Sequence, residues 1–292
     1  MSHPVRFGVK VAGQNTSVAE MRTCWRIADE AGFDHLWDFD HLAGVKSSGL
    51  DSPIFEGWSL LAAMAEATSR IRIGCLVTGN PYRHPAWLAK LAVTVDHLSG
   101  GRLEFGIGLG GWPEREHKMY GIEGLDHLVG RLSESLQVMT GLWTQDRTNF
   151  QGRYYQLSDA ISNPKPLQKP HPPIWIGTRG ESTLKLVARH ADVWNVTEWW
   201  FEDATAARQM GERLQEECER EGRDPATLRW SAQIFWDGQD RARLKSVAAA
   251  YLEQGFTEIV IFPDVRATGG DPIAATTIAA EELPALRRLS GS

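Results

Sequence analysis

Short apolar runs alternate with longer segments of helical periodicity along most of the chain. The apolar runs predict strands over 6–11, 35–37, 71–77, 103–108, 174–177, 192–194, 228–235 and 258–262. The segments between and after them predict helices over about 17–31, 57–68, 85–98, 126–142, 182–188, 203–221, 240–254 and 272–289. Such alternation indicates parallel strands joined by crossover helices. Eight strand–helix pairs in one chain predict an α/β fold, the (β/α)8 TIM barrel.

A doubly wound open sheet is the alternative fold. It usually has fewer strands, and the Gly-x-Gly-x-x-Gly turn that follows its first strand is absent from this sequence.

The segment over about 143–173 interrupts the alternation. Asn149–Tyr155 predicts a small hairpin around Gln151 and Gly152, and five prolines over 164–173 exclude a regular helix there. Because the alternation resumes at Ile174, we interpret the segment as an insertion over the barrel, between the fourth helix and the fifth strand. Residues 1–292 are therefore expected to form a single domain.

Composition and charge narrow the function classes. With 292 residues and 42% hydrophobic content, the chain can bury a large core. A net charge of −6 with both signs interspersed argues against nucleic acid, and no apolar run is long enough to span a membrane. The first residues lack the apolar core of a signal peptide, and the three cysteines show no metal-ligand pattern. We expect a cytoplasmic protein that binds no metal.

Two stretches at predicted strand ends are candidates for a ligand site. Cys75–Ala86 supplies a hydroxyl at Thr78, a carboxamide at Asn80 and an Arg-His pair at 83–84. Gly106–Trp112 contains four glycines, which let bare backbone approach a flat or phosphorylated ligand. Each stretch alone is equally consistent with a tight strand-to-helix turn. Together, one strand apart at the same rim of a barrel, they favour a cofactor site.

A third candidate is Gly177–Gly180, which follows the fifth predicted strand and begins a helix. Its backbone amides, the hydroxyl of Thr178 and the guanidinium of Arg179 suit a phosphate group. The alternative is an ordinary helix N-terminus. We favour the phosphate interpretation.

Asp40 and His41 lie where the second predicted strand ends. Histidine can donate, accept or shuttle a proton near neutral pH, and an adjacent carboxylate can fix its tautomer. The alternative is a loop cap at Asp40 and a buried polar side chain at His41.

Acidic and aromatic residues complete the set of candidates. Glu114, Glu116 and His117 resemble part of a metal cluster, but their charged neighbours favour a solvated face or a lid over the site. Several tryptophans fall near predicted strand ends; most suit the core, and a few suit the wall of an aromatic pocket. The candidates for substrate contact are Trp112, Glu114 and Trp194.

Several longer motifs carry a resemblance that covers nearly the whole chain. They are Val77–Ala86, Leu88–Lys90, Val95–Arg102, Gly106–Gly108, Glu116–His117 with Tyr120–Gly121, Phe150–Tyr155, Asn163–Pro166 and Pro172–Gly177. With these motifs the sequence resembles the bacterial luciferase-like flavin superfamily. More narrowly, it resembles the branch that uses the deazaflavin coenzyme F420.

The resemblance implies a (β/α)8 barrel with the flavin or deazaflavin ring at the carboxyl rim. It also implies a non-proline cis peptide under the ring at the end of the third strand, for which Cys75–Leu76 is the candidate. The Asp-His pair that faces the ring in the deazaflavin branch matches Asp40 and His41. The implied cofactor-binding residues are Asp40, Cys75, Leu76, Thr78, Asn80, Gly108, Leu109, Gly110, Gly111, Trp112, Gly177, Thr178, Arg179 and Gly180.

One departure from the resembled branch bears on the substrate. Its sugar-phosphate dehydrogenases carry a catalytic glutamate just after the fourth-strand glycines, where this chain has Gly111 and Trp112. His41 is left as the candidate for proton transfer. The resemblance implies an F420-dependent oxidoreductase, often dimeric, that acts on an enone, imine, carbonyl, alcohol or nitro compound. The alternatives are an FMN-dependent monooxygenase on the same fold and a non-catalytic flavin-binding protein.

Overall fold

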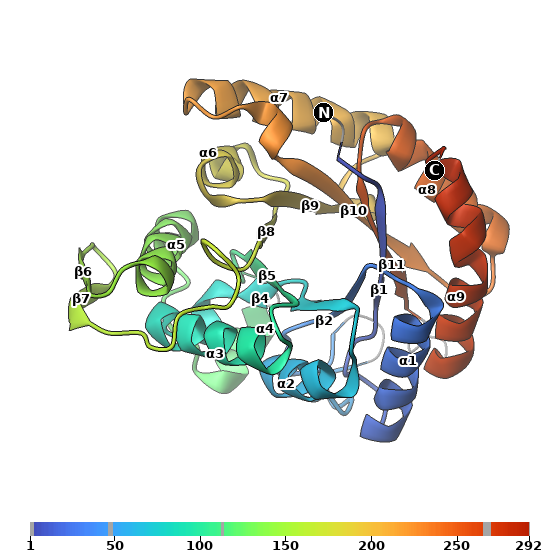
Figure 1. The fold of residues 1–292 in the computed structure, drawn as a ribbon, viewed down its shortest axis with the longest axis horizontal. Helices are drawn as coiled ribbons and strands as arrows, with labels where there is room; N and C mark the ends of the chain where they lie inside the picture. Colours follow the sequence, from blue (N-terminus) through green and yellow to red (C-terminus); the bar gives the residue numbers. More distant parts are fainter. Residues whose placement is uncertain (1–2, 46–48, 112–113, 265–269, 292) are drawn as a thin grey trace.

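In the computed structural model, eight parallel strands close into a barrel surrounded by helices, within the described residues 3–45, 49–111, 114–264 and 270–291 (Figure 1). The strands are β1 (Arg6–Lys10), β2 (His35–Asp38), β3 (Arg72–Cys75), β5 (Leu103–Gly108), β8 (Ile174–Gly177), β9 (Val193–Thr197), β10 (Arg229–Trp236) and β11 (Glu258–Pro263). They lie in the order β3-β2-β1-β11-β10-β9-β8-β5, and pairing of β3 with β5 closes the ring. The predicted (β/α)8 barrel is confirmed.

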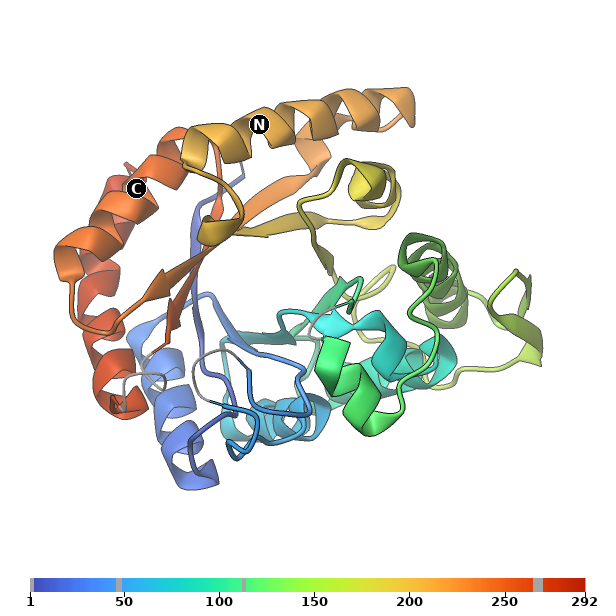
Figure 2. The same cartoon turned by 180° about the vertical axis from the view of Figure 1, so that it is seen from behind.

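The helices form the outer layer, as the view from behind also shows (Figure 2). They are α1 (Val18–Ala31), α2 (Gly57–Ala67), α3 (Pro85–Leu98), α4 (Glu114–Tyr120), α5 (Leu128–Thr144), α6 (Glu181–His190), α7 (Ala204–Arg220), α8 (Arg241–Glu253) and α9 (Pro272–Leu289). Several begin where the sequence offers a cap: the side chains of Ser17, Asp203, Asp240 and Asp271 accept hydrogen bonds from first-turn amides. Such caps explain why most predicted boundaries fall within two residues of the observed ones.

The third strand is broken at the point where the sequence predicted a continuous run to Val77. β3 ends at Cys75, and a short β4 (Thr78–Gly79) resumes the pairing with β5. The peptide bond between Leu76 and Val77 is cis, one bond beyond the predicted Cys75–Leu76 position. A Cβ atom at Gly106 would lie 2.1 Å from the Cys75 carbonyl oxygen, so the bulge requires a glycine on the neighbouring strand.

The predicted hairpin is present between α5 and β8. β6 (Thr148–Gln151) pairs antiparallel with β7 (Gln156–Ala160), and the pair projects beside α5 rather than over the barrel mouth (Figure 1). The proline-rich segment that follows is fastened to α3, because the buried carboxylate of Asp96 accepts hydrogen bonds from the amides of Leu167 and Gln168.

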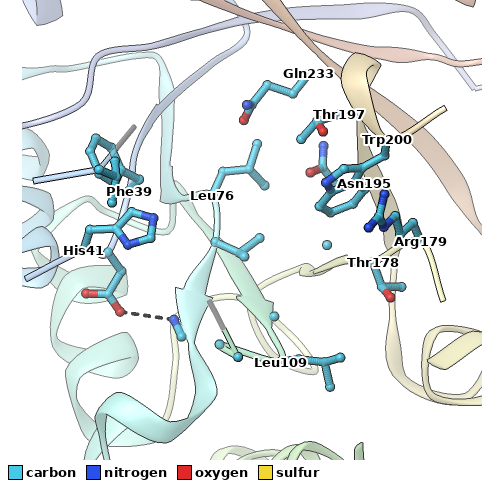
Figure 3. A pocket seen from close by; sticks show the side chains of 18 of the residues that line it. Phe39, His41, Leu76, Leu109, Thr178, Arg179, Asn195, Thr197, Trp200 and Gln233 are labelled. Atoms are coloured by element: carbon cyan, nitrogen blue, oxygen red, sulfur yellow. Dashed lines mark hydrogen bonds between the residues drawn. The ribbon is translucent and has the colours of Figure 1, made fainter. Parts of the chain in front are cut away.

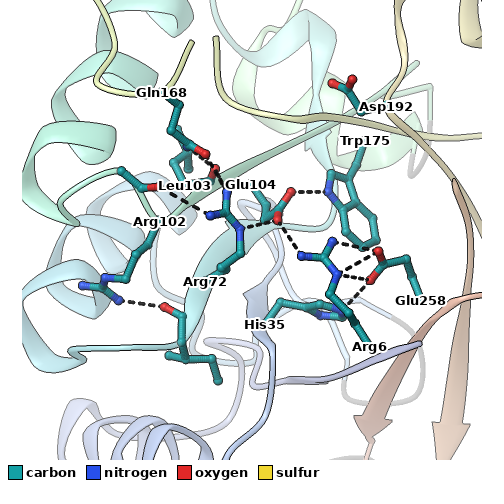
Figure 4. A network of polar contacts seen from close by, with 12 residues as sticks. Arg6, His35, Arg72, Arg102, Leu103, Glu104, Gln168, Trp175, Asp192 and Glu258 are labelled. Carbon is teal, nitrogen blue, oxygen red and sulfur yellow. Dashed lines mark hydrogen bonds and ion pairs between the residues drawn. The ribbon is translucent and has the colours of Figure 1, made fainter. Parts of the chain in front are cut away.

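A network of charged side chains closes the amino end of the barrel, opposite the rim that the sequence predicted to be functional (Figure 4). The buried carboxylate of Glu258 accepts hydrogen bonds from Arg6 at 2.7 Å and Arg229 at 2.6 Å, and lies 3.1 Å from His35 Nε2. Burial by itself raises the pKa of Glu258. The hydrogen bond with His35 and the charges of Arg6 and Arg229 outweigh burial and lower that pKa to about 2.

Glu258→Gln is expected to lower the free energy of unfolding at neutral pH by roughly 3 kcal/mol, the equivalent of a pKa lowered from 4.5 to about 2. Because the folded-state pKa lies below the unfolded one, this stabilisation is complete above pH 4.5 and is lost as the pH falls toward 2. Urea denaturation at neutral pH and at about pH 3 checks this, since the gap between variant and wild type should shrink in acid. A gap that widens in acid would contradict it. Glu30→Gln, which removes an exposed partner of Arg26, is the matched control.

Candidate active site

A cavity of about 690 Å³ opens at the carboxyl rim of the barrel, in the size range of small-molecule sites (Figure 3). Most of the sequence-predicted site residues line it. They are Asp40, His41, Leu76, Gly108, Leu109, Gly110, Gly111, Gly177, Thr178, Arg179 and Gly180. The structure therefore brings together the segments after the second, third, fourth and fifth barrel strands.

Five other predicted residues do not line the cavity. Cys75 and Asn80 are buried beneath the rim, and Thr78 is buried with its hydroxyl accepting a hydrogen bond from Trp58 Nε1 at 3.0 Å. Glu114 is exposed and pairs with Lys118. The fifth residue, Trp194, packs in the outer core. A sixth predicted residue, Trp112, lies outside the described residues.

Trp194 faces the helices instead of the cavity. β9 continues to Thr197, three residues beyond the run from which it was predicted, and side chains alternate along it. Asn195 and Thr197 therefore line the cavity. Trp194 packs on the rings of Trp230 and Phe256 in the outer core.

Asp40 forms an ion pair with Arg83 that spans two rim segments. The guanidinium donates to both carboxylate oxygens, at 2.6 and 2.9 Å, and the amide of Gly79 donates at 3.3 Å. Arg83 also pairs with Glu56, the N-cap residue of α2. Burial raises the pKa of Asp40, while the hydrogen bonds and charge of Arg83 oppose that rise. The Asp40 carboxylate is thus paired with Arg83. These contacts do not support the prediction that Asp40 orients the adjacent His41.

His41 instead contacts Glu116, which the sequence assigned to a solvated face or a lid. Its Nδ1 lies 3.1 Å from Oε2 of Glu116, whose side chain is fully buried. Burial by itself raises the pKa of Glu116, but the hydrogen bonds with His41 and Tyr82 and the charge of His41 lower it to about 2. Glu116 is therefore an ionised hydrogen-bond acceptor on one side of the imidazole ring, while His41 itself lines the cavity.

Lys10 is a buried cation in the cavity wall and was not among the predicted site residues. Its Nζ donates to the Leu76 carbonyl oxygen at 2.5 Å and to Gln233 Oε1 at 3.2 Å. It also lies 5.6 Å from the ring centre of Phe39 and 5.2 Å from that of Phe262. A charged donor is thus fixed next to the bulge at the third strand.

The glycines of the rim are required by their protein neighbours as well as by the open cavity. A Cβ atom at Gly108 would lie 2.7 Å from Val77 Cγ2, and one at Gly177 would lie 3.1 Å from Val77 Cγ1. Gly110 has a φ of +66°, which an L-residue rarely adopts. The glycines therefore make room for Val77 at the Leu76–Val77 bulge and leave bare backbone at the cavity wall.

The segment 177–180 leads into the N-terminus of α6. Thr178 Oγ1 accepts a hydrogen bond from the Gly180 amide at 3.3 Å, and Arg179 extends to the exposed edge of the cavity. The amino end of this ten-residue helix and the arginine both favour an anionic group.

Aromatic side chains form much of the remaining wall. Trp199 and Trp200 follow β9, with ring centres 6.0 Å apart, and Trp199 lies 6.3 Å from Phe235. Phe235 in turn lies 5.1 Å from Phe262. In the view of Figure 3, Phe39 and His41 lie on one side of Leu76, and Trp200, Asn195 and Arg179 lie on the other. A planar apolar group fits between such walls.

The described ranges contain neither a candidate metal cluster nor a helix that could span a membrane. No group of three or more His, Cys, Asp or Glu side chains there could hold a metal ion. Nor does any helix in those ranges have the length and apolar character needed to cross a membrane.

Comparison with known proteins places this fold and rim in a family. The luciferase-like monooxygenase family profile matches residues 1–281. The chain belongs to this family. The relatives of the chain include enzymes named as FMNH(2)-dependent and as F420-dependent. An FMNH(2)-dependent dimethylsulfone monooxygenase of Pseudomonas putida is 29% identical over 216 residues, which are 69% of this chain and 56% of the relative.

An F420-dependent glucose-6-phosphate dehydrogenase of Nakamurella multipartita is 30% identical over 200 residues, 65% of this chain and 55% of the relative. The chain thus spans about half the length of the curated relatives it matches. Among solved structures, an F420-dependent secondary alcohol dehydrogenase in complex with an F420-acetone adduct superposes with a TM-score of 0.82 at 17% identity. That match covers 97% of this chain and 99% of the other, and it supports the shared fold.

Proposed function

We propose that this family member is an F420-dependent oxidoreductase that transfers a hydride between the deazaflavin and a small organic substrate. The substrate class is an enone, imine, carbonyl or alcohol, or nitro compound. The observation that carries the proposal is His41 in the wall of a largely apolar cavity, with its Nδ1 held by a buried carboxylate. This arrangement provides a proton donor or acceptor next to a surface that suits a flat ring system.

The residues around the bulge fit a flavin-like ring. Leu76 and Val77 present an apolar surface, and the strip Gly108–Gly111 adds bare backbone beside it. When bound there, the deazaflavin would supply a carbon-centred hydride donor or acceptor. The bulge would support one face of the ring and exclude water from it.

The anionic tail of the cofactor fits the segment 177–180. Arg179 and the N-terminal amides of α6 would bind its phosphate, and Ser182 and Thr183 line the same part of the cavity. These contacts position the cofactor without taking part in the chemistry.

Two groups in the cavity suit the charge changes of hydride transfer. His41 would deliver a proton to the substrate atom next to the one that receives hydride, or remove it in the reverse direction. Lys10 and its neighbour Gln233 place a charged donor and a neutral amide in the cavity wall, and Lys10 would stabilise negative charge on a substrate oxygen bound beside it.

Anaerobic turnover with reduced F420 and a panel of acceptors tests the proposal. We expect oxidation of the deazaflavin by at least one conjugated carbonyl, imine or nitro compound. Oxygen-dependent product formation with reduced FMN, and none with F420, would favour the monooxygenase alternative that the dimethylsulfone relative represents. Binding of either cofactor without turnover of any acceptor would favour a non-catalytic flavin-binding protein.

Arg179→Ala is expected to weaken F420 binding roughly 10- to 100-fold, because a charge-assisted hydrogen bond to the tail phosphate is lost. The rate of hydride transfer at saturating cofactor should stay within about threefold of wild type. Arg147→Ala, which removes an exposed arginine of the hairpin, is the control. Unchanged affinity in Arg179→Ala would place the tail elsewhere.

Three further expectations from the sequence remain proposals. We propose that residues 1–292 form a single domain, that the protein acts in the cytoplasm, and that it forms a homodimer. The exposed Trp87 of α3, 75% accessible, offers an apolar surface for such an assembly. Light scattering at working concentration measures the mass that decides the oligomeric state.

A further inference from the structure

We infer that Glu116 is a positioning residue that fixes the tautomer of His41, with the proton on Nδ1 and with Nε2 as the atom that exchanges protons. The proton-exchange part of this inference rests on the proposed function. The positioning part rests on the contacts of Glu116 alone and can be tested without any substrate.

The contacts of Glu116 come from several segments and use both carboxylate oxygens. Oε1 accepts hydrogen bonds from the backbone amides of Leu42 and Ala43, the latter at 2.9 Å. Oε2 accepts one from the Tyr82 hydroxyl at 2.7 Å and lies 3.1 Å from His41 Nδ1. The same carboxylate thus fastens the loop after β2 to α4 and to the 3-10 turn η2 (Asn80–Tyr82).

Other contacts keep α4 on this loop. The Tyr120 hydroxyl donates to the Leu42 carbonyl oxygen at 2.7 Å, and Arg115 Nη2 lies 3.5 Å from the Gly44 carbonyl oxygen. The short helix is therefore attached to the segment that carries His41 at several points. Such attachment leaves the carboxylate little freedom to turn away from the imidazole ring.

An ionised carboxylate can only accept hydrogen bonds, so Nδ1 of His41 must carry the proton that is shared with Oε2. The Tyr82 hydroxyl uses its proton to donate to the same Oε2 atom, so it does not change the need for a proton on His41 Nδ1. The other charged groups nearby, Asp40 and Arg83, are paired with each other. Asp264 and Lys10 line the same cavity. Glu116 is in direct contact with Nδ1 of the His41 ring, and we infer that its orientation dictates which nitrogen is protonated.

Glu116→Gln tests this geometry sharply because it preserves the size of the side chain. The amides of Leu42 and Ala43 require an oxygen at the Oε1 position, so the NH2 group of glutamine must take the place of Oε2. That NH2 group is a donor, and it would face Nδ1. His41 must then accept at Nδ1 and carry its proton on Nε2, which is the reverse of the wild-type tautomer.

Nitrogen-15 NMR of histidine-labelled protein at about pH 8, where a free histidine is neutral, reports the tautomer of each ring. The signals of His41 are identified by their loss in His41→Ala. We expect wild-type His41 to be protonated on Nδ1, and the Glu116→Gln variant to be protonated on Nε2. Glu114→Gln is the matched control, because it removes an exposed carboxylate two residues away on the same helix and should retain the wild-type tautomer.

A proton on Nε2 in wild-type His41 would overturn the inference, and this result needs no variant to fold. An unchanged tautomer in a folded Glu116→Gln protein would also overturn it. The rate separates this inference from the proposed function. With the tautomer reversed, we expect hydride transfer to slow roughly 100-fold or more, with F420 affinity within about threefold. A reversed tautomer with an unchanged rate would uphold the positioning role and refute proton transfer by His41.

Discussion

His41→Ala is expected to slow the hydride-transfer half-reaction roughly 100- to 10,000-fold, the usual contribution of a positioned general acid or base. Cofactor affinity should stay within about tenfold, a change of no more than about 1.4 kcal/mol. The reason for the difference is that His41 lines the cavity but is held by Glu116, whereas the bulge and the glycine strip carry the surface for the ring. Single-turnover mixing of saturated reduced cofactor with acceptor measures the first quantity, and fluorescence titration measures the second.

The control for this variant is His97→Ala, which removes an exposed histidine on α3 bonded only to the Lys165 carbonyl oxygen in the contacts described. It should leave both quantities unchanged. If His41→Ala turns over at the parent rate, the histidine is a wall of the pocket, and proton transfer passes to water or to the substrate itself.

Arg83→Met is expected to destabilise the protein by about 3–5 kcal/mol, because it leaves the fully buried carboxylate of Asp40 without its cation. The two rim segments that Arg83 joins should also separate, which weakens F420 binding. Urea denaturation gives the free energy of unfolding of the variant and the wild type. Arg26→Met, which breaks an exposed pair with Glu30, should cost less than about 1 kcal/mol.

The double variant Asp40→Asn with Arg83→Met decides whether the cost comes from the unpaired charge. We expect it to be more stable than Arg83→Met alone, because the neutral amide is cheaper to bury than a carboxylate. If the double variant is no more stable than Arg83→Met alone, Arg83 does not stabilise the protein through its ion pair with Asp40.

The fold could be predicted from sequence because its signals are local. Strand and helix periods alternate, and caps such as Ser17 and Asp271 mark where helices begin. The break in the third strand was not visible in the apolar run up to Val77. The break depends on the space that Gly106 leaves on the neighbouring strand β5. The pattern of apolar residues along the third strand alone cannot indicate that space.

The alternation of side chains along the barrel strands predicts part of the site from sequence. Side chains alternate along a barrel strand, so polar residues two apart, such as Ser231 and Gln233, point inward together. The same alternation separates Asn195 from Trp194, and it places Lys10 on the same face of β1 as Arg6, which points into the barrel. Alternation along the sixth barrel strand therefore predicts that Asn195, and not Trp194, faces the cavity.

The remaining contacts depend on segments that are distant in sequence. Glu116 meets His41 across 75 positions, and Arg83 meets Asp40 across 43. Nothing in the charged run around Glu116 distinguishes the carboxylate that becomes buried from the exposed Glu114 beside it. Adjacent residues in sequence suggested an Asp40–His41 pair, whereas the backbone directs their side chains to different partners.

Titration of the purified protein with F420 and, separately, with FMN tests the central claim most directly. The change in tryptophan fluorescence reports binding, since Trp199 and Trp200 line the cavity. A deazaflavin enzyme should bind F420 with a micromolar or lower dissociation constant and bind FMN at least about tenfold more weakly. Micromolar binding of FMN, with no binding of F420, would contradict the proposed function.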